Sequence, residues 1–113
     1  MAKLERVISR VDFNALLYRI ENGILNGSST ASLEDSSDYC QGDTRVAVRV
    51  FERYSAMGGN RVSLNVTMVQ NGQEPIFLSA ITAGGSQALF FKINTLGEEN
   101  FLECIRALLD ECR

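Results

Sequence analysis

Apolar residues recur along this chain at two different periods, which predict helices near both ends and strands between them. The first helix face follows the i, i+3, i+4, i+7 spacing and consists of Phe13, Leu16, Leu17, Ile20 and Ile24. Asp12 is placed to cap its first turn, and Gly27 is a suitable end. A second stripe follows a Thr95-x-x-Glu98 capping box and consists of Phe101, Leu102, Ile105, Leu108, Leu109 and Cys112. We therefore predict one helix near each end of the chain.

Between these helices, apolar and polar residues alternate with the period of a strand. Residues 44–54 place Val46, Val48, Val50 and Tyr54 on one side and Arg45, Arg49 and Arg53 on the other. Residues 61–70 place Val62, Leu64, Val66 and Met68 on one side. We expect a hairpin in which these two apolar sets share one face. That arrangement pairs even-numbered residues with even-numbered ones and needs a loop of three or five residues.

Turn signals at Asn71-Gly72 and Gly84-Gly85 delimit two more strands, residues 76–83 and 88–93. Residues 29–34 and 4–9 are weaker strand candidates. The order predicts an α+β fold, with an antiparallel sheet of four to six strands and two helices on one face, in strand-helix-strands-helix order. This order resembles the helix-grip and TATA-binding-protein-like architectures, an analogy that implies no function. A length of 113 residues favours a single domain, 1–113.

Composition excludes several classes of function. Eleven Lys and Arg against fourteen Asp and Glu give a formal charge of -3, the wrong sign for a domain that neutralises nucleic-acid phosphates. No apolar run is long enough for a membrane span or a signal peptide, so we expect a cytoplasmic protein. Three cysteines without CxxC spacing and no histidine predict reduced thiols, no metal site and no cofactor. Gly84-Gly85 precedes a strand rather than a helix, which disfavours a phosphate-binding loop.

Candidate chemistry is sparse because, without histidine, a general base needs a strongly shifted pKa. Glu52 shares the strand face of Val48, Val50 and Tyr54, which we expect to be the core side. It either reaches solvent where the strand ends or lines a pocket, and an arginine of the hairpin is expected to contact it. We expect residues 34–43 to form a solvated acidic loop, with cation binding as the alternative. The stripe Arg45, Arg49 and Arg53 is expected to be a solvated face offset by these acids, with an anion site as the alternative.

Two functional readings remain open, and neither assigns a catalytic residue. The first is a non-enzymatic domain that associates with a second copy or another partner through its sheet, because both faces of residues 76–93 are apolar. Its predicted interface residues are Phe77, Ile81, Phe90 and Phe91, and a homodimer is the expected state. The alternative is a pocket for a small apolar ligand between the sheet and the C-terminal helix, with Glu52, Tyr54 and Tyr18 as polar anchors. An enzyme that uses Glu52 and an arginine is a third and weaker reading.

Three stretches of the chain resemble a family of short bacterial proteins catalogued only as a domain of unknown function. They are Asn26-Gly27-Ser28 with residues 31–35, Gly42-Asp43-Thr44-Arg45 through residues 52–55, and residues 82–87 through 90–95. The resemblance covers most of the chain. It implies a single-domain cytosolic protein and supplies no catalytic residues.

Overall fold

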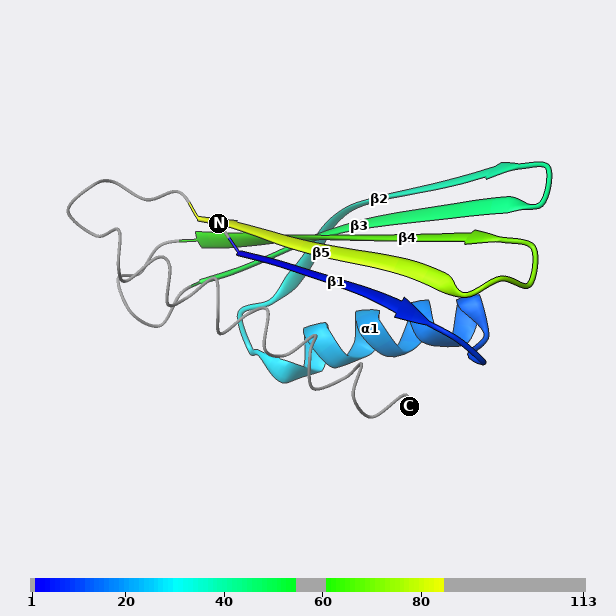
Figure 1. Ribbon diagram of the computed structural model, residues 1–113. Coiled ribbons are helices and arrows are strands. Elements are labelled where there is room, and N and C mark those ends of the chain that lie inside the picture. Colours follow the sequence, from blue (N-terminus) through cyan, green and yellow to red (C-terminus); the bar gives the residue numbers. More distant parts are fainter. Residues whose placement is uncertain (1, 55–60, 85–113) are drawn as a thin grey trace.

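The computed structural model describes residues 2–54 and 61–84, which form one helix and five strands (Figure 1). In chain order these are β1 (Ala2–Ile8), α1 (Phe13–Gly27), β2 (Ser32–Gln41), β3 (Thr44–Tyr54), β4 (Arg61–Asn71) and β5 (Ile76–Gly84). The architecture is therefore α+β with a five-stranded antiparallel sheet, as predicted. Within the described ranges, no helix is long and apolar enough to cross a membrane.

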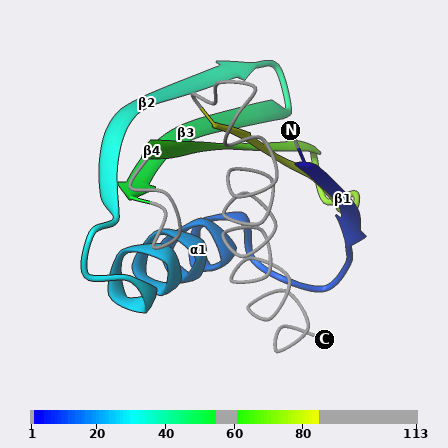
Figure 2. The ribbon, with the colours of Figure 1, turned by 90° about the vertical axis from the view of Figure 1, so that its left-hand side faces the viewer.

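The sheet has the order β1-β5-β4-β3-β2, and each neighbouring pair is antiparallel. β1 and β2 therefore lie at opposite margins, which is plain in the end-on view of Figure 2. The predicted Asn71-Gly72 turn is confirmed, and Gly72 and Gly42 both adopt positive φ, near +58° and +57°. The amide of Gly72 donates to the carbonyl of Asp43 at 2.8 Å, which ties the two turns together.

The helix α1 lies on one face of the sheet, and its prediction is confirmed in detail (Figures 1 and 2). The Asp12 side chain accepts a hydrogen bond from the amide of Ala15 at 3.0 Å and so caps the first turn. All five residues of the predicted stripe are buried. They pack in one core with residues from four strands: Leu4, Ala47, Phe51, Val62, Leu64, Val66, Met68, Ile76, Leu78 and Ala80.

The predicted register of the β3–β4 hairpin is wrong. Tyr54 pairs with Arg61 and Phe51 with Leu64, so odd-numbered residues of one strand face even-numbered residues of the other. Six residues separate the strands in sequence, instead of three or five. The core side of β3 therefore contains Ala47, Arg49 and Phe51, and the valines with Glu52 and Tyr54 lie on the opposite face. We use "outer face" below for this side of the sheet, opposite α1.

The acidic segment 34–43 is also not a loop, because residues up to Gln41 continue β2. Its register shifts between Leu33 and Asp35, which places Glu34 in a bulge. β2 is exposed along almost its whole length because it pairs with β3 alone among the described strands. Pairing with β3 has overridden the weak strand propensity of this sequence.

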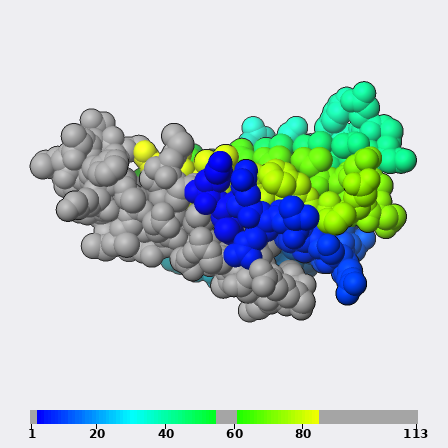
Figure 3. All heavy atoms as spheres, in the orientation of Figure 1, coloured from blue at the N-terminus to red at the C-terminus, as the bar shows by residue number. Residues whose placement is uncertain are grey.

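The predicted second helix and the predicted strand 88–93 lie outside the described residues, as do Phe90 and Phe91. In the space-filling view of Figure 3, the atoms of β1 form part of the surface that faces the viewer.

Candidate functional site

The most distinctive surface is a row of apolar side chains that crosses the outer face. The register of the four strand pairs sets five residues directly side by side, one from each strand: Val7, Phe77, Val69, Val46 and Tyr39. Val7 is 69% exposed, Tyr39 57% and Phe77 41%, and the two central valines are half-buried. With strands about 4.8 Å apart, the row extends about 19 Å across the sheet.

Apart from Glu52, which pairs with Ser63, the three central strands place no charge on the outer face between Ser63 and Val69 of β4 and the residues paired with them. Their side chains there are Phe77, Ser79, Ile81 and Ala83 on β5, Ser63, Asn65, Thr67 and Val69 on β4, and Val46, Val48 and Val50 on β3. The charged residues stand at the margins: Lys3 and Glu5 on β1, Asp35 on β2 and Glu52 at the end of β3. An uncharged centre with a charged border is the anatomy of a protein interface.

Glu52 lies on the outer face, contrary to the expectation that it points to the core. It forms an ion pair with Arg61 at 2.7 Å, so the predicted contact with an arginine of the hairpin is confirmed. The same guanidinium lies 3.7 Å from Glu34 and 5.5 Å from the centre of the Tyr54 ring. Glu52 and Tyr54 therefore belong to one exposed cluster at a corner of the sheet.

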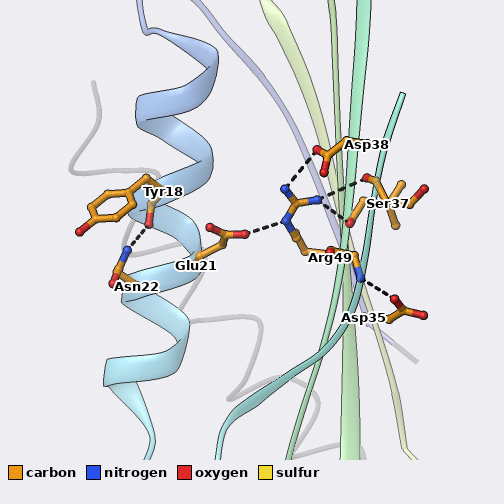
Figure 4. A network of polar contacts seen from close by, with 9 residues as sticks. Tyr18, Glu21, Asn22, Asp35, Ser37, Asp38 and Arg49 are labelled. Atoms are coloured by element: carbon orange, nitrogen blue, oxygen red, sulfur yellow. Dashed lines mark hydrogen bonds and ion pairs between the residues drawn. The ribbon is translucent and has the colours of Figure 1, made fainter. Parts of the chain in front are cut away.

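The arginine stripe of β3 lies on the α1 side of the sheet, and two of its members, Arg49 and Arg45, contact the helix instead of lying free in solvent. Arg49 is buried, and its Nε donates to Glu21 of α1 at 2.6 Å, while its Nη2 donates to Asp38 of β2 at 3.1 Å (Figure 4). Its Nη1 donates to the carbonyls of Val48 at 2.9 Å and Ser37 at 3.3 Å. Arg45 is placed over the Phe13 ring, 4.3 Å from its centre.

The pKa of Arg49 lies above its ordinary value. Burial disfavours the charged guanidinium, but the hydrogen bonds to Glu21 and Asp38, together with their negative charges, outweigh that cost. Arg49 therefore stays charged at neutral pH and well above it. The network joins α1, β2 and β3. Its role is structural, because these partners already accept the hydrogen bonds that the Arg49 guanidinium donates.

Tyr18 does not join Glu52 and Tyr54. Its ring is exposed on α1, on the far side of the helix from the sheet, and its carbonyl accepts a hydrogen bond from Asn22 at 2.8 Å (Figure 4). Glu52 and Tyr54 lie on the opposite face of the sheet from this helix. The three predicted anchors thus do not line one pocket.

Polar clefts that the sequence did not indicate lie beside the start of α1. One has a volume of about 240 Å³ and is bordered by Asp12, Phe13, Asp43 and Arg45. A neighbouring cleft of about 320 Å³ includes Arg10 and Glu74. Each lining contains two carboxylates and one arginine, so both clefts carry both signs of charge. Within the described ranges, no group of three or more histidine, cysteine or acidic residues could hold a metal ion.

Comparison with known families places the chain in a group without an assigned activity. A family model matches residues 1–113. The chain belongs to the family of unknown function DUF6054. This confirms the resemblance to an uncharacterised family, and membership assigns neither a reaction nor a site residue. No curated protein and no solved structure matches the chain.

The apolar row is the feature that sequence reasoning missed most completely. Phe77 was singled out as an interface residue, but Val7, Val69 and Tyr39 gave no signal of their own. They become neighbours only through the register of four strand pairs. The available signal was the valine alternation of β3, which was assigned to the wrong face.

Proposed function

We propose that this protein is a small non-enzymatic domain that associates with a second copy of itself through the outer face of its sheet. The observation that supports this most directly is the uncharged centre of that face, crossed by the apolar row from Val7 to Tyr39. Phe77 and Ile81, which the sequence indicates as interface residues, both lie on this face. Contiguous exposed apolar patches of this kind usually mark interaction sites.

A second copy is the occupant that the geometry favours. In a two-fold contact the same patch serves both partners, and two-fold dimers are the commonest closed assembly of a single chain. Two sheets pack face to face about 10 Å apart, with side chains from both faces between them. An uncharged centre desolvates at little cost, while Glu52, Arg61 and Asp35 at the border keep contact with water.

The outer face also offers no machinery for catalysis among the described residues. Among its described charged groups, Glu52 is already paired with Arg61, and Lys3 lies 4.0 Å from Glu5. The polar residues at the centre are hydroxyls and an amide, and Thr67 donates to Asn65 at 2.9 Å. These groups fit hydrogen bonds across an interface better than bond-breaking chemistry.

Sedimentation equilibrium of the full chain tests this proposal. At micromolar concentration the mass should be a multiple of 12.5 kDa. Phe77→Ser should raise the dissociation constant of the outer-face contact about tenfold or more, because a large side chain near an interface centre is a typical hot spot. Tyr18→Ser is the control, since it removes an aromatic residue that is even more exposed (68% against 41%) from the opposite side of the molecule. A mass of 12.5 kDa at all concentrations would rule out self-association.

Three finer points rest on the sequence pattern and belong to this proposal. The capped apolar stripe from Thr95 to Cys112 favours a second helix on the α1 side, which would give the helix-grip or TATA-binding-protein-like arrangement. The family resemblance supports a bacterial, cytoplasmic setting, and the free, exposed Cys40 fits a reducing compartment.

A further inference from the structure

The two margins of the described sheet differ in whether they could accept another strand. An edge strand presents unpaired backbone groups and is a template for pairing with another chain. β1 and β2 occupy these positions, and each has one partner among the described strands, β5 and β3 respectively. The shape and the charges of β2 oppose pairing with a second copy, whereas those of β1 favour it.

β2 is protected against pairing with a copy of itself. The bulge at Glu34 interrupts its edge, and bulges of this kind are a common defence of natural sheets. Its charged side chains are Glu34, Asp35 and Asp38, and it contains no basic residue. Pairing of β2 with β2 of a second copy would therefore bring acidic side chains together.

β1 lacks the bulge and the single sign of charge that protect β2, because its charged side chains are Lys3, Glu5 and Arg6. It pairs with β5 without a register shift over its seven residues, from Ala2 opposite Thr82 to Ile8 opposite Ile76. Lys3 and Glu5 are both exposed on the outer face, 4.0 Å apart. Atoms of β1 form part of the surface that faces the viewer in Figure 3, and β1 lies at the margin of the sheet in Figure 2.

We propose that β1 pairs antiparallel with β1 of a second copy, centred on Leu4, so that two five-stranded sheets become one continuous sheet of ten strands. In this register Leu4 lies opposite Leu4 of the partner subunit, and Lys3 lies opposite Glu5 of the partner subunit. The two-fold axis repeats the second pair, so two opposite-charge pairs flank the centre. Directly opposed unlike charges stabilise a strand pair, and like charges destabilise it.

The neighbouring registers that keep both core sides on one face are less favourable. Centring the contact on Glu5 sets that residue against Glu5 of the partner subunit. Centring it on Lys3 sets two lysines against each other. A shift of one residue would turn core positions toward the outer face. The charge pairs, together with the requirement that the core residues of both copies lie on one face, thus select the register centred on Leu4.

This contact goes beyond the proposed function because it uses a different surface. An axis perpendicular to the sheet keeps both α1 helices on the same side of the joined sheet. The two outer faces then lie side by side, and both remain exposed to solvent. Edge pairing and outer-face association can therefore be tested separately.

The experiment uses two charge reversals in the full chain, Lys3→Glu and Glu5→Lys, each combined with Phe77→Ser to remove the outer-face contact. Each reversal alone sets like charges opposite each other in both pairs and should weaken association about tenfold or more. An equimolar mixture restores both pairs between unlike chains, whereas the pair within each chain stays broken. The variant chains have formal charges of -5 and -1, from -3 in the parent, so overall attraction does not drive mixing.

The chain with Phe77→Ser alone should sediment at twice 12.5 kDa. Each charge reversal should lower that mass toward 12.5 kDa. The equimolar mixture of the two reversals should restore the mass of the dimer. Glu74→Lys in the same background is the control, because it changes net charge as Glu5→Lys does but lies off β1. A mixture that keeps the mass of its separate components would overturn the proposal, as would a monomeric Phe77→Ser chain. Neither result would touch the outer-face proposal, which is tested in the chain with Phe77 intact.

Discussion

Removal of Glu21 tests how strongly the buried arginine holds the helix to the sheet. In Glu21→Ala, Arg49 loses its 2.6 Å partner while its own side chain remains only 9% exposed. Alanine is the best helix former, so the propensity of α1 does not suffer. The change therefore isolates the loss of the ion pair.

The burial of the two partners sets the expected magnitude. Breaking a fully buried pair costs about 3 to 5 kcal/mol, and an exposed pair is worth about 0 to 1 kcal/mol. The Glu21 side chain is 26% exposed, between these limits, so we expect a loss of about 2 kcal/mol. The Asp38 side chain is 53% exposed, and Asp38→Asn should cost about 0.5 kcal/mol.

Urea unfolding followed by circular dichroism measures both losses. With a slope of about 1 to 2 kcal/mol per molar urea, Glu21→Ala should lower the midpoint by about 1 to 2 M, and Asp38→Asn by less than half of that. Asn14→Ala, an exposed position of the same helix, should leave the midpoint nearly unchanged. If Glu21→Ala unfolds with the midpoint of the parent or of Asp38→Asn, the Glu21 contact does not hold α1 in place.

Three further substitutions probe other parts of the chain. Asp12→Ala removes the acceptor for the Ala15 amide and should cost about 1 kcal/mol in thermal unfolding; an unchanged melting temperature would contradict the cap. Gly42→Ala puts a side chain at φ +57° and should cost about 1 to 2 kcal/mol, whereas Gly27→Ala, with open space around it, should cost nothing. Ile105→Ala should cost about 2 to 5 kcal/mol if the predicted second helix is docked, and an equal urea midpoint would show that it is not.

The predictions that succeeded rest on local signals. A helix has its period and its cap written within one stretch of chain, so α1 could be located from Asp12 and the spacing of its apolar residues. The extents of β3, β4 and β5 followed in the same way from alternation and from Asn71-Gly72. The resemblance to an uncharacterised family also needed only the sequence.

The hairpin register failed because β3 is apolar on both sides. Val46, Val48 and Val50 alternate with Ala47 and Phe51, and the arginines between them made the second side look solvated. Arg49 is buried because Glu21 and Asp38, 28 and 11 residues away, meet its charge. No rule of alternation within β3 contains that information.

The sequence by itself therefore determined the helix, the extents of the central strands and the absence of histidine chemistry, because each depends on neighbouring residues or on composition. The tertiary structure alone decided which side of the sheet is the core, since that depends on where α1 packs. It also decided that Glu52 meets Arg61, that acidic residues form an edge strand, and that Val7, Phe77, Val69, Val46 and Tyr39 become neighbours. Each of these depends on strand register, which joins residues far apart in the chain.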